Sequence, residues 1–131
     1  MANVVITGGS RGIGAAAVSL FAGRGDRVWF LYEKNHEKAQ AVAECTGATA
    51  ICCDVADGEA VAAAFRQIGD VDILICNAGM LLFSTLVRTS PEALGRIIDL
   101  HCTTTTLLCR YYGEVMKERR SGRILIMSSS T

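Results

Sequence analysis

The sequence predicts an α/β protein with three layers, in which helices cover both faces of a doubly wound parallel sheet. Short, continuous apolar runs alternate along the chain with longer segments of helical hydrophobic period, a pattern typical of strands buried on both faces. A glycine-rich segment, residues 7–14, follows the first apolar run, where such a sheet turns into its first helix. Half of the 131 residues are apolar (50%), which suits one domain over residues 1–131.

The first half of the chain alternates clearly between strands and helices. Strands are predicted over residues 4–6, 28–31 and 48–53, and helices over residues 13–23 and 37–45. Gly47 stops the second helix, because glycine readily adopts the left-handed conformation that often follows a helix. Asp54 then ends the third strand.

The second half continues this alternation. Strands are predicted over residues 71–76 and 123–127, and helices over residues 58–68 and from Pro91 to about residue 120. Asp57 and Ser90 are suited to cap the two helices, because their side-chain oxygens accept bonds from the N–H groups of a first turn. Basic residues at 117–120 suit a last turn, and Gly122 is the predicted terminator.

The segment after the first strand reads Thr-Gly-Gly-Ser-Arg-Gly-Ile-Gly, which is the composition of a loop that binds a diphosphate. Glycines let the backbone turn tightly and approach the ligand, while the helix N-terminus offers unpaired N–H groups to the anion. A tight turn without a ligand is the alternative, but this segment sits in a complete strand-turn-helix frame. The predicted binding residues of the loop are Thr7, Gly8, Ser10, Arg11, Gly12, Ile13 and Gly14.

These residues make the chain resemble the short-chain dehydrogenase/reductase family, whose fingerprint Thr-Gly-x-x-x-Gly-x-Gly is matched in full. The Ser-Arg-Gly-Ile-Gly version is similar to that of 3-oxoacyl-acyl carrier protein reductases. The resemblance implies a Rossmann fold, of which this chain holds the first five strands and which is incomplete at the C-terminus. It also implies cofactor contacts after the third strand, from Asp54 and Val55, and after the fourth, from Asn77, Ala78 and Gly79. Cys76 stands where the family motif has its first asparagine.

The end of the second strand bears on the choice of nicotinamide cofactor. Proteins that bind NAD(H) usually present a carboxylate there to the ribose 2′-hydroxyl, whereas the spacing from Gly14 places Tyr32 at this point. A 2′-phosphate would meet no repulsion from Tyr32 and could pair with Arg11. NADP(H) is therefore favoured over NAD(H), and Glu33, one residue further on, is the opposing observation.

The resemblance implies hydride transfer to a ketone of the 3-oxoacyl thioester type, with a serine that holds the carbonyl and a tyrosine that acts as general acid. By motif position the serine is Ser129, with Ser128 packed into the structure beside it, and the alternative is a polar strand end without a catalytic role. The tyrosine and lysine of the family's Tyr-x-x-x-Lys motif are absent, and Tyr111 and Tyr112 are expected to pack within a helix. His101 stands where the family has a relay asparagine, and is either a proton relay or an ordinary packed histidine.

Composition limits the other partners. Thirteen basic residues balance thirteen acidic ones, which argues against nucleic acid and membrane surfaces. The chain shows no export signal and no apolar stretch of about 20 residues, so a cytoplasmic location is expected. The six cysteines have no Cys-x-x-Cys spacing, and we expect free thiols rather than a metal site or disulfides.

The remaining expectations concern substrate and assembly. Small-molecule or acyl carrier protein-linked carbonyl compounds are the implied substrates, and Leu81, Leu82 and Phe83 either border them or simply pack. The family implies a homodimer or homotetramer for the complete protein, and an unpaired outer strand at residues 123–127 predicts self-association of this chain. The alternatives are a non-catalytic nucleotide-binding fragment or interaction module, and an unrelated nucleotide user such as a methyltransferase.

Overall fold

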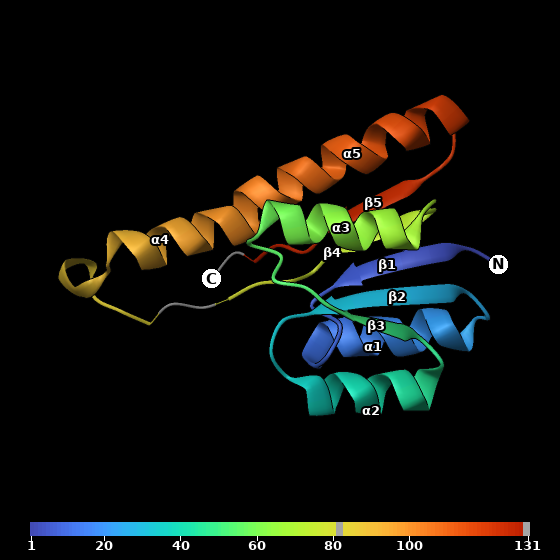
Figure 1. Ribbon diagram of the computed structural model, residues 1–131, viewed down its shortest axis with the longest axis horizontal. Coiled ribbons are helices and arrows are strands. Elements are labelled where there is room, and N and C mark those ends of the chain that lie inside the picture. Colours follow the sequence, from blue (N-terminus) through green and yellow to red (C-terminus); the bar gives the residue numbers. More distant parts are fainter. Residues whose placement is uncertain (81–82, 130–131) are drawn as a thin grey trace.

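The computed structural model describes residues 1–80 and 83–129. Its centre is a sheet of five parallel strands in the order β3-β2-β1-β4-β5 (Figure 1). The strands are β1 (Asn3–Thr7), β2 (Arg27–Tyr32), β3 (Thr49–Cys52), β4 (Ile73–Cys76) and β5 (Arg123–Ile126). The direction in which strands are added reverses between β1 and β4, and ligands bind beside such a reversal in open α/β sheets.

Helices cover both faces of the sheet (Figure 1). On one face lie α1 (Gly12–Gly23) and α2 (His36–Thr46), and on the other lie α3 (Gly58–Ile68) and α5 (Thr104–Arg119). The predicted three-layer, doubly wound α/β fold is thereby confirmed. In the part of the chain that the structure describes, no helix is both long enough and apolar enough to cross a membrane.

Strand β1 shows why the strands are continuous apolar runs in the sequence. Val4 and Ile6 belong to the core beneath α1 and α2, whereas Val5 belongs to the core beneath α3 and α5. All three are fully buried, at 0% exposure, because side chains alternate between the faces of a strand and both faces are covered here. Each such burial contributes about 1.5–3 kcal/mol to the free energy of unfolding.

The helical segment that begins at Pro91 is a rod in three parts rather than one uniform helix. The first part is α4 (Pro91–Ile98), which passes through a π-helical segment (Asp99–Thr103) into α5. Helix α4 extends beyond the end of the sheet (Figure 1), after a short 3₁₀ turn at Leu86–Arg88. Single π-helical turns inside a helix occur frequently at functional sites.

The end of α5 corrects the role predicted for Gly122. The helix stops at Arg119, and Arg120 takes the left-handed conformation with φ 56°. The N–H of Ser121 donates to the Met116 carbonyl at 3.1 Å, so this turn satisfies the last carbonyls before the chain reaches Gly122. Packing requires the glycine instead, because a Cβ at Gly122 would lie 2.3 Å from Cγ of Met116.

Candidate nucleotide-binding site

A cavity of about 850 Å³ opens at the carboxyl ends of the central strands. Its walls come from the loop after β1, the end of β2, the segments after β3 and β4, and the rod formed by α4 and the π-helical segment. Lining residues include Arg11, Tyr32, Val55, Gly79, Arg96 and His101. The fold therefore brings the glycine-rich loop, the end of β2 and the segments after β3 and β4 to one site.

The glycine-rich loop is held tightly against the sheet. The N–H groups of Gly8 and Gly9 both donate to the carbonyl of Leu31, at 2.9 and 3.1 Å. A Cβ on Gly14 would lie 2.0 Å from the carbonyl oxygen of Gly8. A Cβ on Gly9 would lie 2.4 Å from Cβ of Phe30. Close packing of the loop therefore requires glycine at these positions, whether or not a ligand is bound.

The start of α1 is the part of the loop best suited to an anion. The side chains of Asn35, Asp57 and Ser90 cap α2, α3 and α4, but no described side chain caps α1. The first N–H groups of a helix have no intrahelical partner and carry the positive end of its dipole. Gly12, with φ 58° and open space where a Cβ would stand, keeps the approach clear. These features fit the diphosphate of a dinucleotide.

Thr7 and Asn77 join the ends of β1 and β4. The hydroxyl oxygen of Thr7 accepts bonds from the N–H groups of Asn77 and Ala78, at 3.0 and 2.9 Å. The side-chain amide of Asn77 donates to the carbonyl of Gly8 at 3.1 Å. The two residues therefore hold the glycine-rich loop and the segment after β4 at a fixed separation, from positions behind the cavity wall.

Tyr32 lies at the end of β2 and lines the cavity. Its hydroxyl is hydrogen-bonded to Nδ1 of His36 at 2.8 Å, and the two rings meet edge-on with centroids 5.3 Å apart. Desolvation and, to a smaller extent, the Cys52 thiol raise the pKa of Tyr32 above its ordinary value of 10.0. Tyr32 therefore presents a neutral hydroxyl at this point of the cavity.

Two carboxylates near the end of β2 and after β3 share one guanidinium from α4. Nη2 of Arg96 lies 2.5 Å from Oε1 of Glu33, and Nη1 lies 3.2 Å from Oδ2 of Asp54. Hydrogen bonding to Asp54, followed by the charges of both carboxylates, raises the pKa of Arg96. Sequence reasoning missed Arg96, because its partners lie 63 and 42 positions away and no local spacing signals the pairing.

His101 lies in the π-helical segment and borders the cavity. Its Nε2 is 3.2 Å from both the backbone nitrogen and the carbonyl oxygen of Met80, and the tautomer decides which of them it bonds. A Cβ on Gly79 would lie 2.9 Å from Cε1 of the ring. The histidine is thus packed against the segment after β4, and a role as proton relay stays a proposal.

The predicted serines and Phe83 of the predicted substrate loop are exposed and lie outside the cavity wall. Ser129 follows β5, is exposed, and is not part of the cavity wall. The expectation that Ser128 packs into the structure is wrong, because it is exposed beyond an edge strand. Leu81 and Leu82 lie outside the described residues, and Phe83 is exposed rather than packed.

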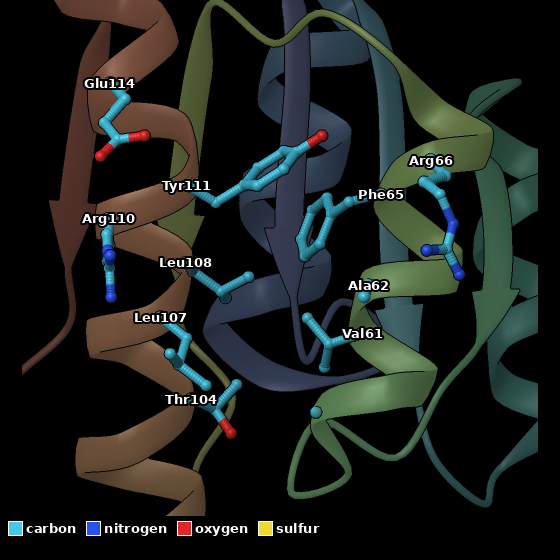
Figure 2. A pocket seen from close by; sticks show the side chains of 11 residues that line it. Val61, Ala62, Phe65, Arg66, Thr104, Leu107, Leu108, Arg110, Tyr111 and Glu114 are labelled. Carbon is cyan, nitrogen blue, oxygen red and sulfur yellow. The ribbon is translucent and has the colours of Figure 1, made fainter.

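A second hollow of about 500 Å³ lies between α3 and α5, and Figure 2 shows Val61, Phe65, Leu108 and Tyr111 projecting into the space between these helices. Tyr112 is buried and meets Phe65 edge-on at 4.8 Å between centroids, as predicted for a packing residue. Tyr111 is 53% exposed, but its ring meets that of Tyr112 edge-on with centroids 5.0 Å apart, so it also packs, at the surface of α5. Apolar side chains dominate this hollow, and we assign it no part in the chemistry.

All six cysteines are free thiols in the structure. Burial raises the pKa of Cys53 to about 11 and that of Cys76 to about 12, so both thiols are neutral at physiological pH. Within residues 1–80 and 83–129, no cluster of His, Cys, Asp and Glu side chains is arranged to hold a metal ion.

The fold and the cavity define a Rossmann-type α/β protein, with a glycine-rich loop and an uncapped helix start beside the reversal of strand order. The family model described as short chain dehydrogenase matches residues 2–131. The chain belongs to this family.

Relatives of known name or structure agree with this assignment. A cyclic-di-GMP-binding biofilm dispersal mediator protein of Escherichia coli is 38% identical over 131 residues, covering 96% of this chain and 52% of the relative. An acetoacetyl-CoA reductase of Paracoccus denitrificans is 34% identical, covering 95% of this chain and 53% of the relative. A metagenomic short-chain oxidoreductase solved in complex with NADP has a TM-score of 0.90 at 29% identity, covering 99% and 63% of the two chains. The chain spans about half the length of the curated relatives it matches.

The structure divides the predicted cofactor residues into two groups. The cavity wall includes Gly8, Ser10, Arg11, Tyr32, Val55, Ala78 and Gly79. The others lie outside that wall: Thr7, Gly12, Ile13, Gly14, Asp54 and Asn77. Among these, Thr7, Gly14 and Asn77 shape the loop, and Asp54 is engaged by Arg96.

Proposed function

We propose that this chain is the NADP(H)-binding part of an oxidoreductase that reduces a ketone of the 3-oxoacyl thioester type to the hydroxy product. The observation that carries the proposal is the N-terminus of α1, which no described side chain caps and which begins beside the cavity-lining residues Ser10 and Arg11. Helix starts of this kind bind phosphate groups. The NADP complex of a family member with a TM-score of 0.90 supports the same cofactor.

The residues of the chain take distinct parts in this proposal. The glycine-rich loop binds the diphosphate, and Arg11 pairs with the 2′-phosphate of NADP(H) at the edge of the cavity. Tyr32 faces the adenosine ribose, and Asp54 and Val55 lie towards the adenine. Ala78 and Gly79 border the middle of the cofactor, and Asn77 supports this segment from behind the cavity wall. Thr7 contributes by holding this segment in place.

The bound reduced nicotinamide would supply the hydride, which is transferred to the carbonyl carbon. In our proposal the carbonyl oxygen gains a proton, for which Ser129 provides a hydrogen bond and His101 holds a water in the relay position. The 131 residues contain no Tyr-x-x-x-Lys motif. We therefore propose that the chain by itself binds the nucleotide with weak or absent turnover, and that the general acid belongs to a complete enzyme.

The decisive experiment titrates the chain with NADPH and with NADH and follows nucleotide fluorescence. We expect saturable NADPH binding, and Arg11→Ala should weaken NADPH binding about tenfold while changing NADH binding little, since one charge-assisted phosphate contact is removed. Arg110→Ala is the matched control, because Arg110 is an exposed arginine that lines the other hollow. Absence of binding would overturn the proposed function, and equal losses for both nucleotides would overturn the choice of NADP(H).

A non-catalytic nucleotide-binding or interaction module is the second candidate, favoured by the relative named for cyclic-di-GMP binding. Competition between NADPH and cyclic di-GMP distinguishes the two, because a module of that kind releases NADPH when the cyclic dinucleotide is added. For the complete enzyme we propose a small-molecule or acyl carrier protein-linked carbonyl substrate and a homodimer or homotetramer. The cytoplasmic location stays a prediction.

A further inference from the structure

We propose that Arg96 determines cofactor specificity by neutralising Glu33, so that the cavity accepts the 2′-phosphate of NADP(H) despite an acidic residue beside it. The inference rests on the proposed function and deepens it. Neither the position of Arg96 in the sequence nor the motifs of the glycine-rich loop suggest such a role. It follows from the contacts between α4 and the ends of β2 and β3.

The geometry of the contact is specific. Arg96 is the sixth residue of α4 (Pro91–Ile98), and its guanidinium spans the gap between two carboxylates. Nη2 lies 2.5 Å from Oε1 of Glu33, while Nη1 and Nη2 lie 3.2 and 3.4 Å from the two oxygens of Asp54. This fork matches the planar arrangement of donors that only arginine offers. Arg96 and Glu33 both line the cavity.

The position of Glu33 explains why a neutralising charge matters. Glu33 directly follows Tyr32, the last residue of β2, and a carboxylate near this strand end binds a ribose 2′-hydroxyl and repels a 2′-phosphate. Arg96 occupies an oxygen of Glu33 and offsets its charge at contact distance, while it also pairs with Asp54. The side chains of the pair are 38% and 40% exposed, so water and salt weaken the effect without removing it.

The balance of charge around the cavity points the same way. Arg11, Lys34 and Glu33 line the cavity together with Arg96, and Asp54 is bound to Arg96 from the side. With Arg96 present, cations outnumber carboxylates in this group, whereas without it they are equal. A 2′-phosphate carries more negative charge than a 2′-hydroxyl, so loss of Arg96 penalises NADPH selectively.

A purely structural tether is the competing explanation. Through Asp54 and Glu33, Arg96 also fastens α4 to the sheet, and the loss of a tether would weaken NADPH and NADH alike. The ratio of the two dissociation constants therefore separates the explanations, whereas either constant alone does not. Glu33→Gln provides the second test, because it removes the charge that Arg96 is proposed to neutralise.

The experiment measures Kd for NADPH and NADH by fluorescence titration of the full chain and its Arg96→Gln, Glu33→Gln and doubly substituted variants. We expect Arg96→Gln to weaken NADPH about tenfold and NADH less than about twofold, and to shift the ratio less than about threefold when Glu33 is already Gln. Arg110→Gln removes a charge outside the cavity and should leave both constants unchanged.

Each outcome decides a separate point. Equal weakening of both nucleotides by Arg96→Gln, or the same shift in ratio with and without Glu33, would overturn the role of Arg96. Failure of the unaltered chain to bind either nucleotide would instead overturn the proposed function. If Arg96→Gln does not give a cooperative thermal melt, Arg96→Met serves in its place, because methionine also removes the charge. Arg96→Lys keeps the charge and should hold the ratio of NADPH to NADH affinity within about threefold of that of the unaltered chain. A loss of NADPH preference of about tenfold in Arg96→Lys would also refute the role of the charge.

Discussion

Substitution of Gly14 by alanine tests the packing of the glycine-rich loop most directly. Gly14 lies in the first turn of α1, where alanine would ordinarily stabilise a helix by about 0.5–1 kcal/mol. Here the new Cβ would stand 2.0 Å from the carbonyl oxygen of Gly8 and 2.6 Å from Nδ2 of Asn77. Relief requires the loop to move, because the nearest obstacle is backbone and has no rotamer to change.

The expected loss in free energy of unfolding follows from the contacts that break when the glycine-rich loop moves. The bonds from Gly8 to Leu31 and from Asn77 to Gly8 are each worth about 1 kcal/mol, and overpacking adds about 1–3 kcal/mol. After subtraction of the helix gain of about 1 kcal/mol, Gly14→Ala should lower the free energy of unfolding by about 2–4 kcal/mol. NADPH affinity should fall with it, because the displaced loop no longer presents the start of α1.

Urea unfolding followed by circular dichroism measures the loss in free energy of unfolding, and fluorescence titration measures the loss in NADPH affinity. Gly113→Ala is the matched control, because Gly113 lies within α5 and a Cβ there meets nothing within 4 Å. It should stabilise the chain by about 0.5–1 kcal/mol. A Gly14→Ala variant as stable as Gly113→Ala, with unaltered NADPH affinity, would refute the reasoning.

Three further predictions follow from the same structure. Thr7→Val removes the acceptor for the N–H groups of Asn77 and Ala78 and should cost about 1–3 kcal/mol for each orphaned group. Thr49→Val, at the exposed start of the edge strand β3, should change urea stability little, and equal effects of the two substitutions would contradict the link between β1 and β4. Burial raises the pKa of Cys76 from 9.0 to about 12, so the contribution of the neutral thiol to the free energy of unfolding is complete below pH 9 and is lost as pH rises towards 12. Mass spectrometry after treatment with iodoacetamide at pH 8 should find the exposed Cys45 alkylated far faster than the buried Cys76. Similar alkylation rates would contradict the burial of Cys76. The chain should self-associate through the outer edge of β5, where Leu125, Ile126 and Met127 are 45%, 57% and 44% exposed; light scattering that shows only monomer at high concentration would count against it.

The alternation of short, continuous apolar runs with segments of helical hydrophobic period made the fold predictable, because strands covered on both faces leave a clear signal in the sequence. Helix α3 was predicted with its observed ends, since Asp57 marks the first turn and the apolar spacing ends at Ile68. The end of α5 was not, because the left-handed turn at Arg120 is made by a residue type that rarely adopts it. The π-helical segment also leaves no mark in the spacing of apolar residues.

The candidate site was predictable only where one continuous motif forms it. The glycine-rich loop and the segment after β4 directly follow strands, and Tyr32 is the last residue of β2, so the topology carries them to the same edge of the sheet. Arg96 depends on how α4 leans against the ends of β2 and β3, which is a matter of tertiary packing rather than of local pattern. The exposure of Ser128 and Tyr111 likewise depends on what lies beside β5 and α5.

The π-helical segment sets the rotational phase between the two halves of the rod. One face of α4 aims Arg96 at Glu33 and Asp54, while α5 directs the buried Thr104 hydroxyl to the carbonyl of Val55. Since each residue of a helix turns the chain by about 100°, deletion of one residue between Asp99 and Thr103 would bring these two faces out of step. A shortened chain could keep the guanidinium on its carboxylates or Thr104 in its buried position, but not both.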